Sequence, residues 1–406
     1  MKKSINIVGA FDRYNYGDVL FPIILEEFIK KYKTDIFRNY KIEFYGLIDS
    51  NLEYIGGKKT KGMYRLYREK IQPGSAVIVA GGDVLAARIS DLYFDLSDST
   101  VSMYKRKIIR KLLGRNIYEK IIKNKLGVKF KFPWILDSSD FFNHDINILY
   151  NSVGGSTLDT LKYEELLGIK SKLKKCSYLS VRDNKTRENI LNLDKDIKVK
   201  LAPDSAFIMS YLFSLDILKD KVSNKIYKFI EENNSYICIQ TNNWSVNKGN
   251  DKILIKELEL ILEKEDVDIV LLPIGLASNH DDKIALKAIY ESINNKRVHY
   301  FEDVNIFDIM YCIANSKFFA GTSLHGNITA MSYGIRHIGL NKEVRKLDMF
   351  LKTWDIEEQN HCIDFNELYE TYINMKSIDN SKLEDNRNRL VNLSLENFND
   401  MFNILK

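Results

Sequence analysis

The sequence contains little cysteine and no long apolar run. Its four cysteines lie at least 50 residues apart without a Cys-x-x-Cys pair, which excludes a zinc knuckle or disulfide framework and favours a reducing compartment. No uninterrupted apolar stretch approaches the roughly 18 residues of a membrane helix, and the N-terminal residues turn polar too early for a signal peptide. We therefore expect a cytoplasmic protein.

The basic residues are concentrated in one segment. Residues 105–131 carry eleven Lys or Arg and a single acidic residue, Glu119, so this segment has a net charge of +10 and leaves −5 for the rest of a chain whose total is +5. Because no nucleic-acid-binding motif accompanies it, we expect no nucleic-acid partner. Its apolar residues recur at helical spacing, which predicts a basic amphipathic helix that contacts the inner face of the membrane peripherally. The alternative is a helix packed on its own domain with a solvated basic face.

Length and hydrophobic pattern predict two α/β domains. A chain of 406 residues exceeds the size at which one core stops growing. Short β-branched runs alternate with amphipathic stretches, the pattern of βα units in a parallel sheet. We predict one domain over residues 1–213, a second over 214–380 and a closing amphipathic helix over 381–406 that crosses back onto the first domain. The predicted strands are 4–9, 42–47, 76–80, 146–151, 178–181, 198–201, 235–240, 267–274, 298–301, 318–321 and 336–340.

Ligands of open parallel sheets bind beyond the carboxyl ends of the strands, so the loops there are candidate sites. In the first loop, GAFDRYNYGDVLFP, residues Asn15, Tyr16 and Gly17 form a predicted turn and Asp18 is suited to cap a helix beginning near Val19. Backbone amides at such a helix start can hold an anion or a sugar hydroxyl. Alternatively, Asp18 is only a helix cap.

Two further loops of the first domain carry glycine or arginine. Gly81 and Gly82 end an apolar strand and permit close approach of a ligand, although a tight turn without a ligand explains them equally well. Arg182 follows the strand at 178–181, where a guanidinium can hold carboxylate or phosphate, and Asp183 is suited to cap the next helix. The alternative for Arg182 is an ion pair with Asp183 or Asp204.

The fourth loop contains a histidine in FFAGTSLHGNITAMSYG. A strand ends near Gly321, and Thr322 and Ser323 precede His325 and Gly326 at the start of a helix. An imidazole at that position can act as general acid or base, while a hydrogen-bonded structural histidine is the alternative. The sequence has no Gly-x-Ser-x-Gly, no P-loop, no Asp-x-Asp site and no His pair at metal-ligand spacing, so we expect no metal.

Taken together, these loops resemble the polysaccharide pyruvyl transferase family over about residues 5–350. The resemblance is carried, in the family's order, by GAFDRYNYGDVLFP, VIVAGGDVL, NSVGG at 151–155, SVRDNKT, APDSAF, LLPIGLASNHDD and GTSLHGNITAMSYG. It implies two Rossmann-like domains facing a cleft, as in GT-B glycosyltransferases, and transfer of pyruvate from phosphoenolpyruvate to sugar hydroxyls as a ketal. Phosphoenolpyruvate is then a co-substrate, no cofactor is implied, and the sugar acceptor is nucleotide-linked, lipid-linked or polymeric.

The resemblance also implies residue roles. His325 and Arg182 are the predicted catalytic residues. Lys346, which with Phe350 matches a family pattern Lys-x-x-x-Phe, has Lys342 and Arg345 as alternatives. The predicted donor-binding residues are Arg182, Thr322, Ser323, Gly326 and Lys346, and the predicted acceptor-binding residues are Asn15, Tyr16, Gly17, Asp18, Gly81, Gly82, Asn151, Gly154 and Gly155.

The sequence departs from the family at one position. Ser323 stands where well-known members carry an arginine shortly before the Leu-His pair. Two other hypotheses therefore stand beside the pyruvyl transferase: a GT-B-like glycosyltransferase that uses a nucleotide sugar, and a non-catalytic sugar-binding member of a polysaccharide assembly complex.

Overall fold

A computed structural model describes residues 2–405 except 98 and 276–281. The chain divides into two compact units, the first formed by residues up to Ser205 together with the segment from Leu393, and the second by the described residues from Ala206 to Asn392. Residues 206–213, predicted to end the first domain, belong to the second unit instead. The physical reason is hydrogen bonding: Ser210 N donates to Ser332 Oγ at 3.2 Å, and the Tyr333 hydroxyl donates to the carbonyl of Phe213 at 2.7 Å.

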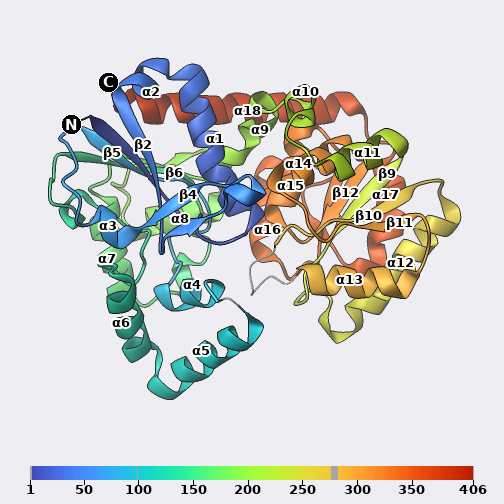
Figure 1. Ribbon diagram of the computed structural model, residues 1–406, viewed down its shortest axis with the longest axis horizontal. Helices are drawn as coiled ribbons and strands as arrows, with labels where there is room; N and C mark the ends of the chain where they lie inside the picture. Colours follow the sequence, from blue (N-terminus) through green and yellow to red (C-terminus); the bar gives the residue numbers. More distant parts are fainter. Residues whose placement is uncertain (1, 98, 276–281, 406) are drawn as a thin grey trace. The chain divides into compact units, whose positions relative to one another are not determined.

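The first unit is built on an eight-stranded sheet in the order β3-β4-β2-β1-β5-β6-β7-β8 (Figure 1). Neighbouring strands pair in parallel, apart from the antiparallel pair β3 and β4. The central strands are apolar because both faces of a parallel sheet are covered, and all five residues of β5 are buried. The strands are β1 (Lys3–Val8), β2 (Tyr40–Gly46), β3 (Ser50–Asn51), β4 (Lys59–Gly62), β5 (Ser75–Val79), β6 (Ile146–Val153), β7 (Tyr178–Val181) and β8 (Lys200–Leu201).

Helices connect the parallel strands of the first unit. The connection from β5 to β6 is the long one, because it contains α4, α5 and α6 where a crossover of about a dozen residues would suffice. The helices are α1 (Tyr16–Tyr32), α2 (Thr34–Asn39), α3 (Met63–Leu66), α4 (Ile89–Asp95), α5 (Thr100–Leu113), α6 (Arg115–Leu126), α7 (Tyr163–Leu173) and α8 (Asn184–Leu193), with 3-10 turns η1 (Glu53–Ile55), η2 (Ser138–Asp140) and η3 (Leu158–Thr160).

The second unit has a six-stranded parallel sheet in the order β11-β10-β9-β12-β13-β14. Its strands are β9 (Tyr236–Gln240), β10 (Asp268–Leu271), β11 (Val298–Tyr300), β12 (Phe318–Gly321), β13 (His337–Leu340) and β14 (Cys362–Ile363). Its helices are α9 (Met209–Leu212), α10 (Leu215–Lys219), α11 (Asn224–Glu232), α12 (Asn250–Lys264), α13 (Asp282–Ile293), α14 (Ile306–Asn315), α15 (Leu324–Tyr333), α16 (Arg345–Trp354) and α17 (Leu368–Met375), with η4 (Ser205–Ile208), η5 (Asn247–Gly249) and η6 (Phe365–Glu367).

The predicted closing helix is confirmed as α18 (Asn380–Asn403), which begins in the second unit and ends in the first. In the first unit, the rings of Phe398 and Phe402 pack on Phe28, with centroids 4.7 and 5.8 Å apart. All three side chains are buried, so the last turns of this helix complete the core of the first unit.

All eleven predicted strands are confirmed, with ends shifted by a few residues. The short strands β3, β4 and β14 were not predicted, because two to four residues are too few for a periodic pattern. The basic segment forms two helices rather than one, since Gly114 between them adopts φ +76°. Among the described residues, no helix is both long and apolar enough to cross a membrane.

Candidate functional site

In the second unit, three neighbouring strands end side by side. Gly321 at the end of β12 lies in register with Gln240 at the end of β9 and with Gly339 of β13. The loops that follow these strands carry Asn242, the predicted residues around His325, and the predicted Lys346 on α16. This carboxyl edge is therefore where the fold gathers polar groups, as expected for an open parallel sheet.

Gln240 and Asp282, which the sequence analysis did not select, hold these loops together. The Gln240 side-chain oxygen accepts from Ser323 N at 2.8 Å and from the Thr322 hydroxyl at 3.3 Å. Its amide nitrogen donates to Asp282 Oδ2 at 2.8 Å, and the same oxygen accepts from two backbone amides in the turn after β10, at 2.7 and 3.0 Å. Gln240 and Asp282 are almost fully buried, so satisfied hydrogen bonds fix the loops after β9, β10 and β12 relative to one another.

His325 is the second residue of α15 and is half-buried. Ser323 caps this helix by accepting from Gly326 N at 3.2 Å. Asn327 donates to the carbonyl of Ser323 at 2.9 Å, and the Thr329 hydroxyl donates to the His325 carbonyl at 2.7 Å. The first turn is thus rigidly held, and the amides at this helix start favour negative charge nearby.

The predicted cation Lys346 is the second residue of α16 and is exposed. Phe350, one turn later, is buried, which orients the helix. The alternative Lys342 already pairs with Asp364 at 3.2 Å and Glu367 at 2.7 Å, so its charge is balanced by neighbours. The other alternative, Arg345, is also exposed.

In the first unit, the loop after β1 differs in detail from the prediction. The helix α1 begins at Tyr16 with Asn15 as its N-cap, so Asp18 lies in the first turn and is not the cap residue. The Asn15 amide donates to Asp18 Oδ2 at 2.9 Å. Asn15 and Asp18 are partly exposed, whereas Tyr16 and Gly17 are buried.

The predicted glycines lie where the chain approaches itself closely. Gly81 and Gly82 adopt φ +102° and +84°, a region that favours glycine. A Cβ atom at Gly81 would stand 2.7 Å from the ring of Phe21. Gly154 N donates to the carbonyl of Gly82 at 2.8 Å and so ties the loops after β5 and β6 together. Close packing thus accounts for Gly81, and the positive φ accounts for Gly82, whose Cβ position would lie 3.5 Å from Asp18 Oδ1.

Arg182 is buried beside carboxylates. Its Nη1 donates to Asp204 Oδ2 at 3.1 Å, the ion pair that was one alternative from the sequence. Burial acts against the charged guanidinium, but the nearby carboxylates of Asp204, Asp83 and Asp183 outweigh it and raise the pKa of Arg182. Asp183 also caps α8, as predicted, by accepting from Thr186 N at 2.7 Å. The role of Arg182 in donor binding stays a prediction.

Asn151 lies under the C-terminal helix. It has no exposed surface, and its side-chain oxygen accepts from Asn397 Nδ2 of α18 at 2.7 Å. The Tyr178 hydroxyl donates to Asn397 Oδ1 at 2.7 Å. Gly155, four residues further on, donates its N–H to the Thr186 hydroxyl at 2.9 Å. The contacts of Asn397 with Asn151 and Tyr178 form a polar anchor for α18.

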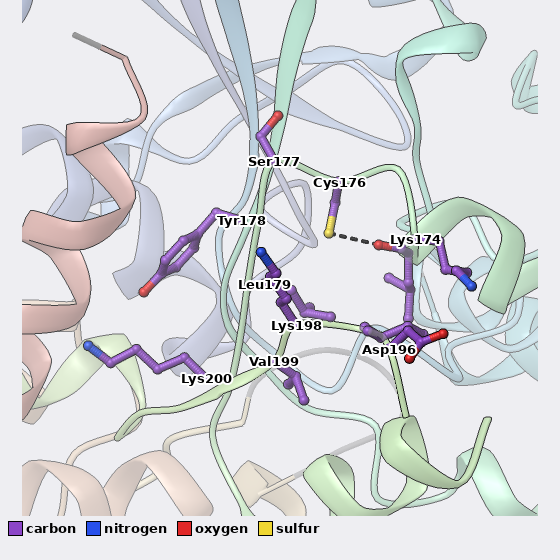
Figure 2. Close-up of a pocket in the computed structure, with 11 residues that line it drawn as sticks. Lys174, Cys176, Ser177, Tyr178, Leu179, Asp196, Lys198, Val199 and Lys200 are labelled. Atoms are coloured by element: carbon purple, nitrogen blue, oxygen red, sulfur yellow. Dashed lines mark hydrogen bonds between the residues drawn. The ribbon is translucent and has the colours of Figure 1, made fainter. Parts of the chain in front are cut away.

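A separate pocket of about 580 Å³ lies at the amino ends of β7 and β8 (Figure 2). The Cys176 thiol at its wall donates to the carbonyl of Leu173 at 2.9 Å, and burial raises the pKa of Cys176 to about 12. Two of its lysines have partners: Lys174 with Asp194, and Lys200 with Asp400. Among the described residues, none that lines this pocket is a predicted site residue. The pocket is therefore distinct from the sites predicted at the carboxyl ends of the strands. His280, in the segment LLPIGLASNHDD that carries part of the resemblance, lies outside the described residues.

Comparison with solved structures shows the class of fold. The UDP-GlcNAc 2-epimerase from Methanocaldococcus jannaschii is similar over 93% of this chain and 92% of its own, with 15% identity and a TM-score of 0.52. The same epimerase in complex with UDP-GlcNAc and UDP is similar over 94% of both chains, with 14% identity and a TM-score of 0.52. The N-terminal domain of Candida albicans trehalose-6-phosphate phosphatase is 10% identical over 100% of this chain and 97% of that one, with a TM-score of 0.50.

At these identities the likeness concerns the fold alone, and it defines a GT-B-like α/β protein with two parallel sheets. The chain belongs to the polysaccharide pyruvyl transferase family, whose model matches residues 15–342, and is therefore a transferase by family. A search of proteins of curated function finds no match.

Proposed function

We propose that this protein transfers the pyruvyl group of phosphoenolpyruvate to two hydroxyls of a sugar, forming a ketal, during synthesis of a cell-surface polysaccharide in the cytoplasm. The observation that supports this most strongly is the placement of His325. It stands in the rigid first turn of α15, at the carboxyl edge of the second sheet and within the residues that match the family. Family membership supplies the reaction type, and the local geometry supplies the candidate acid and base.

The reaction requires the transfer of one proton to a carbon atom of phosphoenolpyruvate. In the first step, C3 of the enol gains a proton while the first sugar hydroxyl bonds to C2 and loses its own. The C2–O bond to phosphate then breaks, inorganic phosphate leaves, and the second hydroxyl bonds to C2 and releases its proton. We assign the proton transfer at C3 to His325, because an imidazole nitrogen can both accept and donate a proton.

The donor carries a carboxylate and a phosphate, which need positive partners. We assign Lys346 on α16 and the hydroxyls of Thr322 and Ser323 to this task. The Gly326 amide already donates to the Ser323 cap, so we assign to the start of α15 the favourable field of the helix dipole rather than this N–H group. Ser323 supplies no positive charge, so this first turn contributes hydrogen bonds instead.

Arg182 has a different balance of charge. Asp204, Asp83 and Asp183 lie near it, so its surroundings carry more negative charge than the guanidinium compensates. A phosphate brought to the same place would meet these carboxylates. We therefore favour a positioning function for Arg182, in which it holds Asp204 and the loop after β8, over direct binding of the donor.

The acceptor side is assigned to the first unit. Asn15 and Asp18 present partly exposed amide and carboxylate groups at the start of α1, and such groups bind sugar hydroxyls by hydrogen bonds. The absence of a side chain at Gly82 leaves space beside Asp18, whereas Gly81 packs against Phe21. Tyr16, Gly17, Asn151, Gly154 and Gly155 would then support this surface from within rather than contact the sugar.

The test combines one variant with isotopic labelling. The protein is incubated in D₂O with phosphoenolpyruvate and a panel of nucleotide-linked and lipid-linked sugars, and products are analysed by mass spectrometry and phosphate release. We expect a ketal whose methyl group carries one solvent deuterium, and loss of turnover by roughly 10²- to 10⁴-fold in His325→Ala, the usual contribution of a general acid or base. His361→Ala, an exposed histidine of the same unit, is the matched control. Normal turnover in His325→Ala would refute the assigned role.

A second candidate is a glycosyl transfer from a nucleotide sugar. It is favoured by the UDP-GlcNAc and UDP complex of the similar epimerase and by Ser323 at the family's arginine position. Thermal unfolding separates the two. A rise in midpoint with phosphoenolpyruvate supports the pyruvyl donor, whereas a rise with UDP and none with phosphoenolpyruvate supports the nucleotide sugar.

A further inference from the structure

The helices α5 and α6 present an apolar surface to the outside of the first unit. Figure 1 shows them as two helices that project from the sheet, in cyan and teal. Leu112 is 80% exposed and Ile108 58% exposed, values unusual for side chains of this kind. The exposed apolar side chains of this pair, here called the hairpin patch, are Val101, Tyr104, Ile108, Ile109, Leu112, Leu113, Ile117 and Ile121.

Helical spacing places the patch residues of α5 along one stripe. On α5, residues 101, 104, 108 and 112 follow one another at intervals of three and four, and 109 and 113 lie beside them. On α6, Ile117 and Ile121 are also one turn apart. An apolar stripe on a globular protein normally faces the core, but α5 turns this stripe away from it.

The opposite face of α5 attaches it to the protein. Arg106 donates to the carbonyl of Tyr93 and lies over its ring, with 4.0 Å between the guanidinium carbon and the ring centroid. Arg110 pairs with Asp91 and lies over the ring of Phe94 at 4.6 Å. These contacts with α4 hold α5 so that the stripe stays outside.

The charge around the patch has one sign. Eleven Lys or Arg lie in residues 105–131. On α5, helical spacing places Lys111 at the border of the stripe and Lys105 within it, and both are exposed. Glu119, the one acidic residue of the segment, is buried, pairs with Arg88 at 3.4 Å and accepts from the Ser90 hydroxyl at 3.0 Å. The outward surface of the pair therefore combines exposed apolar side chains with charges of one sign.

We propose that α5 and α6 form a docking surface for an anionic phospholipid membrane. The apolar stripe enters the boundary between headgroups and acyl chains, and the exposed lysines extend along it to the lipid phosphates. Charge complementarity selects this occupant, since a surface this basic repels a second copy of itself and attracts an anionic headgroup layer. The proposal is independent of the reaction assigned above.

Vesicle cosedimentation of the full chain tests it. The probes are vesicles of phosphatidylcholine alone and of phosphatidylcholine with an equal part of phosphatidylglycerol, at low and high salt. We expect the protein to bind the anionic vesicles, and binding to the neutral vesicles should be at least tenfold weaker. High salt should weaken binding to the anionic vesicles. Ile108→Ser/Leu112→Ser and, separately, Lys105→Glu/Lys111→Glu should each reduce binding at least tenfold, because they remove the apolar and the electrostatic contribution respectively.

Matched controls keep the test specific. Ile253→Ser/Ile284→Ser replaces two exposed isoleucines elsewhere, and Lys252→Glu/Lys296→Glu replaces two exposed lysines elsewhere; both should bind as the unaltered protein does. A dye sensitive to polarity on Leu112→Cys should shift its emission to the blue with anionic vesicles only. No binding of the unaltered protein at low salt, or equal binding by the patch variants, would overturn the proposal. So would a dimer in solution that the Ile108→Ser/Leu112→Ser change dissociates while vesicles remain unbound, since a second copy would then cover the patch.

Discussion

Among single residues, His337 at the start of β13 combines burial with a carboxylate partner. Its Nε2 lies 2.7 Å from Asp355 Oδ2, and both side chains are almost fully buried. Burial acts against the imidazolium, but the charge of Asp355 and its hydrogen bond outweigh burial and raise the pKa of His337 above 6.5. The charged pair therefore stabilises the second unit in a pH-dependent way.

The direction of this pH dependence follows from the thermodynamic linkage between protonation and folding. Because the pKa is higher in the folded state, the stabilisation is fully present below the unfolded pKa of about 6.5 and is lost as pH rises through the folded value. We expect His337→Gln to lower the free energy of unfolding by about 3 kcal/mol at acidic pH and by less at alkaline pH. Urea unfolding of the unaltered protein and of the His337→Gln variant, over a series of pH values from acidic to alkaline, measures the difference in free energy of unfolding. His361→Gln, at an exposed site, should show no such trend; a flat difference for His337→Gln would contradict the prediction.

At the scale of elements, the start of α15 fits closely against its own sheet. Gly326 has no room for a side chain, because an added Cβ would overlap the ring of Phe319 and stand 2.9 Å from Ile274 Cδ1. The glycine is thus needed for close packing of the helix that carries His325.

A methyl group at this position should move the helix start. We expect Gly326→Ala to destabilise the protein by about 1–3 kcal/mol through overpacking and to lower turnover by displacing His325. Chemical unfolding and the ketal assay measure the two effects. Gly168→Ala, in α7, is the comparison, since its nearest neighbour there is Phe130 at 3.3 Å and only a small adjustment is needed. Unchanged stability and turnover in Gly326→Ala would show that the helix start tolerates the methyl group.

For the whole molecule, α18 connects the two units through the chain, and each half of it is buried in a different core. Leu390 has no exposed surface in the second unit, and Phe398 has none in the first. Removing the Phe398 ring leaves a cavity against Phe28 in the first unit alone. The effect should therefore be confined to that unit.

We expect Phe398→Ala to destabilise the first unit by about 3–5 kcal/mol, the usual cost of deleting a buried ring. Hydrogen exchange followed by mass spectrometry should show faster exchange in β1 and β6 and unchanged exchange in β9 and β12. Ile404→Ala, at a 41% exposed position near the end of the chain, should leave both units unchanged. Faster exchange in β9 and β12 as well would mean that the two units unfold together.

The sequence by itself determined the alternation of strands and helices, since hydrophobic period and strand-end glycines are local properties of the chain. It also placed His325 after β12 and Asp183 as a helix cap, because each depends on a few adjacent residues. Lys346, by contrast, was selected through the family pattern Lys-x-x-x-Phe and not through local spacing.

Only the tertiary structure decided which polar side chains are accessible to a ligand and which are hydrogen-bonded to other residues of the chain. Asn151 reads as a site residue in the sequence, yet Asn397, far along the chain, covers it. Gln240 and Asp282 join three loops, although nothing near them in sequence predicts that pairing. The apolar stripe of α5 predicts a helix, but its outward direction depends on Arg106 and Arg110 packing on α4. Hydrogen bonds and burial between distant segments are set by how strands are ordered in a sheet, and local patterns carry no information about that order.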